Sequence, residues 1–181
     1  MTSPLWRRLA AEFLGTALLV TAVVGSGIMA ANLSPTDVGL QLLENSTATA
    51  FALTILILIF GPISGGHFNP AVSAADWWLG RHGNDGLSAR SVGAYIGAAY
   101  WFTSSTSFAN PAVTIGRAFT NTFAGIAPVS VPGFIGAQVL GLLVGIALIA
   151  LLFPVKHRAT DAVVRSDEAP IDDLTTSGAT R

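Results

Sequence analysis

The sequence has no cysteine and few charged residues. Asp, Glu, Lys and Arg together make up 10% of its 181 residues, whereas a soluble globular domain usually carries about 25%. The lack of cysteine excludes a disulfide framework, thiolate metal ligands and cysteine nucleophiles. The formal net charge of -1 provides no excess of positive charge for binding nucleic acid. The chain therefore has too little polar surface to face water on all sides.

Apolar residues are abundant, at 51% of the chain. A helix needs roughly 20 residues to cross a hydrocarbon core about 30 Å thick. We predict spanning helices at residues 9–33, 42–60, 87–103 and 131–153, the third being the shortest. Two shorter apolar segments, 69–79 and 110–123, have the length of re-entrant half-helices. The expected fold is an all-α membrane protein with about four spanning helices and two half-helices.

The charged residues are unevenly distributed along the chain. Basic residues precede the first apolar segment, lie between 81 and 90, and follow the last segment, whereas residues 32–44 contain neither Lys nor Arg. The positive-inside rule then predicts cytoplasmic termini and an external 32–44 loop. The first segment is too long for a signal peptide and contains Glu12, so we interpret it as a spanning helix.

The C-terminal residues differ in composition from the rest of the chain. Residues 159–181 are rich in Asp, Ser, Thr and Ala and have few large apolar side chains. Such a composition is typical of disorder. We therefore divide the chain into a membrane domain, residues 1–158, and a disordered cytoplasmic tail, residues 159–181.

Small residues recur at four-residue spacing in two of the predicted spans. The pairs are Gly93 and Gly97, Ala94 and Ala98, and Gly141 and Gly145. This spacing allows helix backbones to approach closely in lipid, although small residues are common in any membrane helix. Each pair is thus a candidate helix contact.

Two identical triplets are the most specific feature of the sequence. They are Asn69-Pro70-Ala71 and Asn110-Pro111-Ala112, and a valine follows each of them. Asn is a favoured N-cap, and Pro at the first helical position lacks only an N–H that would be unpaired there. One such triplet can be simply a well-capped helix start. Two of them, each opening a half-length apolar segment, indicate an internal inverted repeat with a site between its halves.

Two half-helices that enter from opposite faces would bring both triplets to the middle of the membrane. Each helix N-terminus carries about half a positive charge, which disfavours cations and protons. The Asn amides can donate hydrogen bonds to a neutral solute, and no catalytic residue is needed. The non-helical segments 64–67 and 104–109 can lie at membrane depth only beside a water-filled cavity or buried in protein.

These motifs resemble those of the aquaporin and aquaglyceroporin (major intrinsic protein) family. The resemblance rests on Ala11-Glu12-Phe13-Leu14-Gly15-Thr16, on Ser64-Gly65-Gly66-His67-Phe68-Asn69-Pro70-Ala71-Val72 and on the second triplet. It implies a channel in the cytoplasmic membrane that passes small neutral solutes, works as a homo-oligomer, a tetramer in the family, and needs no cofactor or metal.

The resemblance also assigns roles to the loop before the first triplet. A Glu of the first helix braces a pore loop in the family, and Glu12 takes that place here. Alternatively, Glu12 lies at the membrane interface and extends its carboxylate into water. Gly65, Gly66 and His67 would brace or line the pore, although His67 can equally be a loop-packing residue.

The chain departs from the family in two respects. It has no segments that correspond to the third and fourth of six spanning helices, so the pore wall would lose a third of its helices. The second departure is Val113, which stands where tightly water-selective members have Arg, while Arg117 follows four residues later. Family spacing places the other filter positions at Thr49, Ala98 and Ser107. Such a filter is wide and weakly polar, which implies glycerol-like solutes, neutral metalloid acids such as arsenite, and water.

Three other function classes compete with a channel. The shortened chain can be a non-conducting family member that acts only as a membrane interaction protein. A secondary transporter would need more intramembrane charge than Glu12 supplies. An enzyme has little support because no catalytic constellation or metal-ligand spacing is present. The distance between Asn69 and Asn110 separates the first case from a channel: triplets that meet keep a channel possible, and triplets splayed apart do not.

Overall fold

The computed structural model describes residues 3–79, 89–103 and 105–152. These residues form six α-helices and one 3-10 turn, and the described part of the chain contains no strand. The elements are α1 (Leu5–Leu33), α2 (Val38–Ser64), α3 (Pro70–Trp78), α4 (Ala89–Phe102), α5 (Pro111–Arg117), η1 (Pro128–Ser130) and α6 (Val131–Leu152). The predicted tail, residues 159–181, lies outside the described residues. The all-α membrane fold expected from the sequence is confirmed.

Within the part of the chain that the structure describes, three helices are long and apolar enough to cross a membrane. They are α1 with 29 residues, α2 with 27, and the continuous segment of η1 and α6 with 25. The fourth predicted span, 87–103, corresponds to α4, which has only 14 described residues. At 1.5 Å per residue such a helix is about 21 Å long. Residues 87 and 88 of this predicted span lie outside the described residues.

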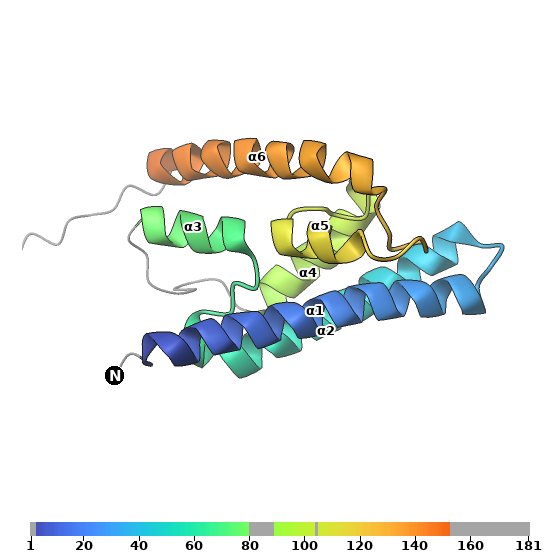
Figure 1. Ribbon diagram of the computed structural model, residues 1–181, viewed down its shortest axis with the longest axis horizontal. Coiled ribbons are helices and arrows are strands. Elements are labelled where there is room, and N and C mark those ends of the chain that lie inside the picture. Colours follow the sequence, from blue (N-terminus) through green and yellow to red (C-terminus); the bar gives the residue numbers. More distant parts are fainter. Residues whose placement is uncertain (1–2, 80–88, 104, 153–181) are drawn as a thin grey trace, which may run out of the picture.

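Helices α1 and α2 form a long antiparallel pair (Figure 1). Asp37 caps α2 by accepting a hydrogen bond of 2.9 Å from the backbone N–H of Leu40. Within the pair, the Asn45 amide donates to the Val23 carbonyl at 2.9 Å and to the Ser26 hydroxyl at 2.8 Å. Both N–H bonds of the Asn45 amide thus have partners inside the helix pair, as expected for a polar donor at a helix contact in lipid.

Helix α4 packs closely on α2 through its small residues. A Cβ at Gly93 would overlap the Thr54 hydroxyl and lie 2.7 Å from the Ala50 carbonyl oxygen, and one at Gly97 would lie 2.9 Å from the Ala50 Cβ. The predicted contact role of Gly93 and Gly97 is confirmed. Gly141 and Gly145 of α6 differ, because no atom lies within 4 Å of a Cβ built on either.

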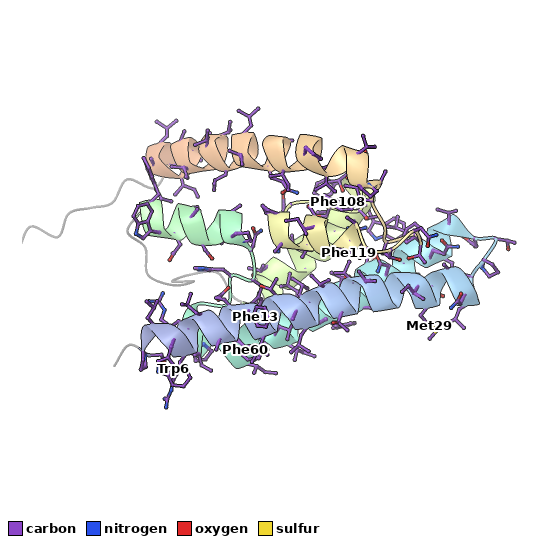
Figure 2. The ribbon with its side chains drawn as sticks, viewed as in Figure 1. Trp6, Phe13, Met29, Phe60, Phe108 and Phe119 are labelled. Atoms are coloured by element: carbon purple, nitrogen blue, oxygen red, sulfur yellow. The ribbon has the colours of Figure 1, made fainter. Side chains whose placement is uncertain are left out.

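The half-helices α3 and α5 lie between the α1–α2 pair and α6 (Figure 1). Large apolar side chains such as Trp6, Phe13 and Met29 point outward from α1, as Figure 2 shows, and all three are more than half exposed. An apolar exterior of this kind suits lipid rather than water. The chain is therefore a multi-pass membrane protein.

Helix α5 ends earlier than the predicted segment 110–123. The last turn tightens, because the N–H of Ala118 bonds to the Ile115 carbonyl and the N–H of Phe119 to the Gly116 carbonyl. The hydroxyls of Thr120 and Thr122 then bond to each other at 2.9 Å. Threonine side chains that bond locally favour a turn over a continued helix, so the helix stops at Arg117.

Candidate functional site

Both half-helices begin at the repeated triplets. The Asn69 side-chain oxygen accepts a hydrogen bond of 3.0 Å from the N–H of Ala71. The Asn110 oxygen accepts from the N–H of Ala112 at 3.0 Å and of Val113 at 3.3 Å. Pro70 and Pro111 occupy the first helical positions. The predicted capping is confirmed at both starts.

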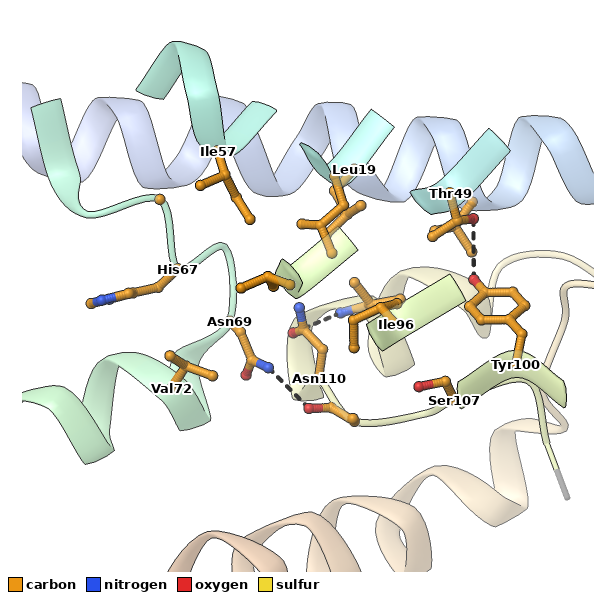
Figure 3. A pocket seen from close by; sticks show the side chains of 16 residues that line it. Leu19, Thr49, Ile57, His67, Asn69, Val72, Ile96, Tyr100, Ser107 and Asn110 are labelled. Atoms are coloured by element: carbon orange, nitrogen blue, oxygen red, sulfur yellow. Dashed lines mark hydrogen bonds between the residues drawn. The ribbon is translucent and has the colours of Figure 1, made fainter. Parts of the chain in front are cut away.

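The two triplets meet and are joined by a reciprocal pair of hydrogen bonds. The Asn69 amide donates to the Ala109 carbonyl at 2.9 Å, and the Asn110 amide donates to the Phe68 carbonyl at 2.7 Å. Each acceptor directly precedes the other triplet (Figure 3). An amide nitrogen carries two N–H bonds, so each Asn keeps a second donor beyond the one used here.

Both asparagines line a cavity of about 230 Å³. Helices α1, α2 and α4 line one side with apolar residues such as Leu19, Leu53 and Ile96, and the two loops line the other side. Figure 3 shows the polar groups in sequence along the cavity. His67 lies at one end, the asparagines in the middle, and Thr49, Tyr100 and Ser107 at the other end.

Three of the four filter positions taken from family spacing line this cavity, namely Thr49, Ser107 and Val113. Ala98 does not: it is exposed and borders a separate surface groove. Ile96 and Tyr100 line the cavity, and residue 98 between them points away because a helix turns by 3.6 residues. The assignment of Ala98 is therefore wrong.

Tyr100 of the same helix lines the cavity where Ala98 does not. It is 3% exposed, and its hydroxyl donates to the Thr49 hydroxyl at 3.2 Å. Counting back from Asn110 by the spacing of the family leads to residue 98, which faces away from the cavity. The available signal was the four-residue spacing of Val92, Ile96 and Tyr100, which predicts one helix face.

Glu12 holds the loop that precedes the first triplet. Its carboxylate accepts hydrogen bonds from the Ser64 hydroxyl at 2.6 Å, from the N–H of His67 at 3.1 Å and from the N–H of Phe68 at 2.6 Å. The side chain thus points inward, and the alternative in which it extends into interfacial water does not describe this structure.

Gly65, Gly66 and His67 shape the same loop. Gly65 ends α2 with φ of 100°, and Gly66 follows with φ of 65°. This left-handed region favours glycine. The His67 ring lies 3.2 Å from the Ser73 hydroxyl and 3.9 Å from the Asp76 carboxylate of α3. His67 also lines the cavity. It therefore packs in the loop and faces the cavity, which are the two alternatives that the sequence left open.

Arg117 lies outside the cavity lining. Its side chain is 1% exposed, and it bonds to Thr106 and Ala124 instead of reaching back toward Val113. Within residues 3–79, 89–103 and 105–152 no cluster of three or more His, Asp or Glu side chains could hold a metal ion.

Comparison with known proteins agrees with this architecture. The family model described as "Major intrinsic protein" matches residues 1–84. The aquaglyceroporin AqpS of Rhizobium meliloti (strain 1021) is 39% identical, covering 82% of this chain and 91% of that protein. Aquaporin Z of Photorhabdus laumondii is 46% identical over 41% of this chain and 32% of that protein, and aquaporin Z of Flavobacterium johnsoniae is 44% identical over 41% and 92%. No solved structure gave a significant match.

The alignment with the Rhizobium protein is longer than the part of this chain that it covers. It runs over 212 positions, but 82% of the 181-residue chain is only about 148 residues. The difference, 212 minus 148, is about 64 positions of the relative that have no counterpart here. Two spans of roughly 20 residues with their loops have about this total length. The match nevertheless extends over nine-tenths of the relative, and the chain therefore belongs to the major intrinsic protein family, whose members are membrane channels and not enzymes.

Proposed function

We propose that this chain is a passive channel for small uncharged solutes, with glycerol as the representative substrate. The observation that carries the proposal is the pair of reciprocal hydrogen bonds in the middle of the central cavity. In it, the Asn69 and Asn110 amides each donate to the carbonyl that precedes the other triplet. It joins the two repeats and leaves one N–H of each amide for a passing solute. The name of the Rhizobium relative supports the same solute class.

The lining of the cavity suits a polyol. None of the described residues that line it is Asp, Glu, Lys or Arg, and most are aliphatic. A polyol can turn its carbon side toward Leu19, Leu53 and Ile96 and its hydroxyls toward Thr49 and Ser107. An ion would lose its hydration shell without gaining a charged partner, and the positive ends of α3 and α5 add a barrier to cations.

We assign the pore roles to the two triplets, to the residues that line the cavity beside them, and to the loop that precedes the first triplet. The two triplets, Asn69 to Ala71 and Asn110 to Ala112, form the centre, and Thr49, Tyr100, Ser107 and Val113 form the filter. Glu12, Gly65 and Gly66 brace the first loop, which presents His67 to the opposite end. The proposed setting is a homotetramer in the cytoplasmic membrane, with the N-terminus in the cytoplasm.

Swelling of proteoliposomes in a stopped-flow instrument tests this function. Purified protein should raise glycerol permeability well above that of empty vesicles. Val113→Trp should abolish the increase because the ring would fill the cavity, whereas Val139→Trp on the exposed face of α6 should leave it unchanged. Permeability equal to empty vesicles, with correct insertion, would contradict the proposal. Arsenite and water are measured in parallel to define the range of solutes.

One observation favours the rival function, a non-conducting membrane interaction protein. A groove of about 580 Å³ between α3 and α6 is lined in part by Asn69, Val72, Ser107 and Ala109, which also line the central cavity. The wall of the cavity is thus thin on that side. If the swelling assay gives no transport, co-purification with a full-length relative becomes the test of this second candidate.

A further inference from the structure

Arg117 is buried without an acidic partner among the described residues. Its guanidinium bonds only to uncharged oxygens: the Thr106 carbonyl at 3.3 Å, the Thr106 hydroxyl at 2.5 Å and the Ala124 carbonyl. It also lies 3.8 Å above the centre of the Phe108 ring. A charged group that is buried without a charged partner is costly, and this one does not line the cavity.

The residue that Arg117 holds belongs to an unfavourable turn. Thr106 and Ser107 have φ of 57° and 61°, a region that residues other than glycine rarely adopt. Ser107 is further tied by its N–H, which donates to the Thr103 hydroxyl at 2.8 Å. The turn directs Ser107 into the cavity and leads to Ala109, whose carbonyl accepts the Asn69 bond (Figure 3).

We propose that Arg117 is a positioning residue that sets solute specificity by clamping the Thr106–Ser107 turn, without contact with the solute. The inference rests on the proposed channel function. The three nitrogens of the planar guanidinium donate hydrogen bonds to the two Thr106 oxygens and to the Ala124 carbonyl. The face of the guanidinium stacks on the Phe108 ring. A lysine ammonium cannot replace it, because it is not planar and does not present several N–H donors in a fixed arrangement. Released from the clamp, the turn relaxes toward ordinary backbone angles, and the Ser107 end of the cavity loses its fixed width.

The ratio of glycerol to xylitol permeability in proteoliposomes measures this effect. Arg117→Met should lower the ratio by about tenfold, the lower end of what a fitted pocket gives for a size difference. Arg117→Lys should fall in between. Thr106→Val keeps the arginine but removes one acceptor, so it should lower the ratio in the same direction, and it remains informative if the Met variant does not fold. Arg90→Met, at the exposed start of α4, is the control and should keep the wild-type ratio.

The double variant Arg117→Met/Thr106→Val distinguishes positioning from general stabilisation. If the two residues act as one clamp, the double variant should lower the ratio no further than Arg117→Met alone. A purely structural role would reduce both permeabilities by one factor and leave the ratio unchanged, and that result overturns the inference while wild-type glycerol transport upholds the channel. Wild-type protein that fails to conduct overturns both.

Discussion

The two half-helices begin with the same four residues but have different surroundings. Helix α5 has three buried residues, Val113, Thr114 and Arg117, whereas α3 has none. Helix α1 packs on α5, where a Cβ at Gly116 would lie 2.6 Å from Val20. An inverted repeat would place an equivalent helix on α3, and the described residues supply none. The comparison shows that the repeated motif determines how each half-helix starts, while neighbouring helices determine how firmly it is held.

The loop before α3 is held by the charged carboxylate of Glu12 and not by a neighbouring helix on α3. Glu12→Gln replaces one carboxylate oxygen by an amide that faces the N–H groups of the loop. Lost hydrogen bonds to a charged group cost about 1.5–3 kcal/mol each, so we expect a loss of about 3 kcal/mol in the free energy of unfolding. Denaturation in detergent measures it. Glu44→Gln, which can keep its bond to Ser34, should cost much less, and equal losses would contradict the bracing role.

Crowding the contact between α5 and α1 should have the next largest effect. Gly116→Leu forces side-chain atoms into Val20, and overpacking of this kind costs about 1–3 kcal/mol. Ala74→Leu on exposed α3 should change stability by less than about 0.5 kcal/mol. Thermal unfolding of the two variants tests the contrast. The expected difference is contradicted if the α3 variant is destabilised as strongly as the α5 variant.

Gln138 is the neutral counterpart of Glu12 on the second loop. Its amide donates to the Phe108 carbonyl at 2.9 Å and to the Thr114 hydroxyl at 2.7 Å. Neutral hydrogen bonds contribute about 1 kcal/mol each, so Gln138→Leu should destabilise the protein by about 1–2 kcal/mol, less than Glu12→Gln. The same unfolding assay ranks them, and the opposite order would show that the second loop depends more on its side-chain bonds.

The contact between His67 and Asp76 should matter least. The two side chains are 3.9 Å apart, which is too far for a direct hydrogen bond. Asp76→Asn should lower the free energy of unfolding by less than about 1 kcal/mol. A larger loss, with Ser73→Ala as the control for the second contact of His67, would show that this pair anchors α3.

Local signals in the sequence predicted local structure well. Asn-Pro at 69 and 110 predicted both capped starts, and the apolar segments located α1, α2 and α6 to within a few residues. The errors have different causes. Ala98 was placed by the spacing of the family, although the four-residue spacing of Val92, Ile96 and Tyr100 indicates another helix face. The early end of α5 follows from the local bond between Thr120 and Thr122, which an apolar segment as a whole does not reveal. The clamp on Thr106 is a tertiary contact with Arg117, so spacing along the sequence could not predict it.

The reciprocal hydrogen bonds between the triplets also affect the order in which the protein can be inserted into the membrane. The ribosome makes the N-terminal part of a chain first, so the Phe68 carbonyl and the Asn69 amide exist before residues 109 and 110 are synthesised. Until then both groups lack the partners that they have in the final structure, and unpaired polar groups are costly in hydrocarbon. The first half must therefore stay in contact with water, or with the insertion machinery, until the second half arrives to complete it.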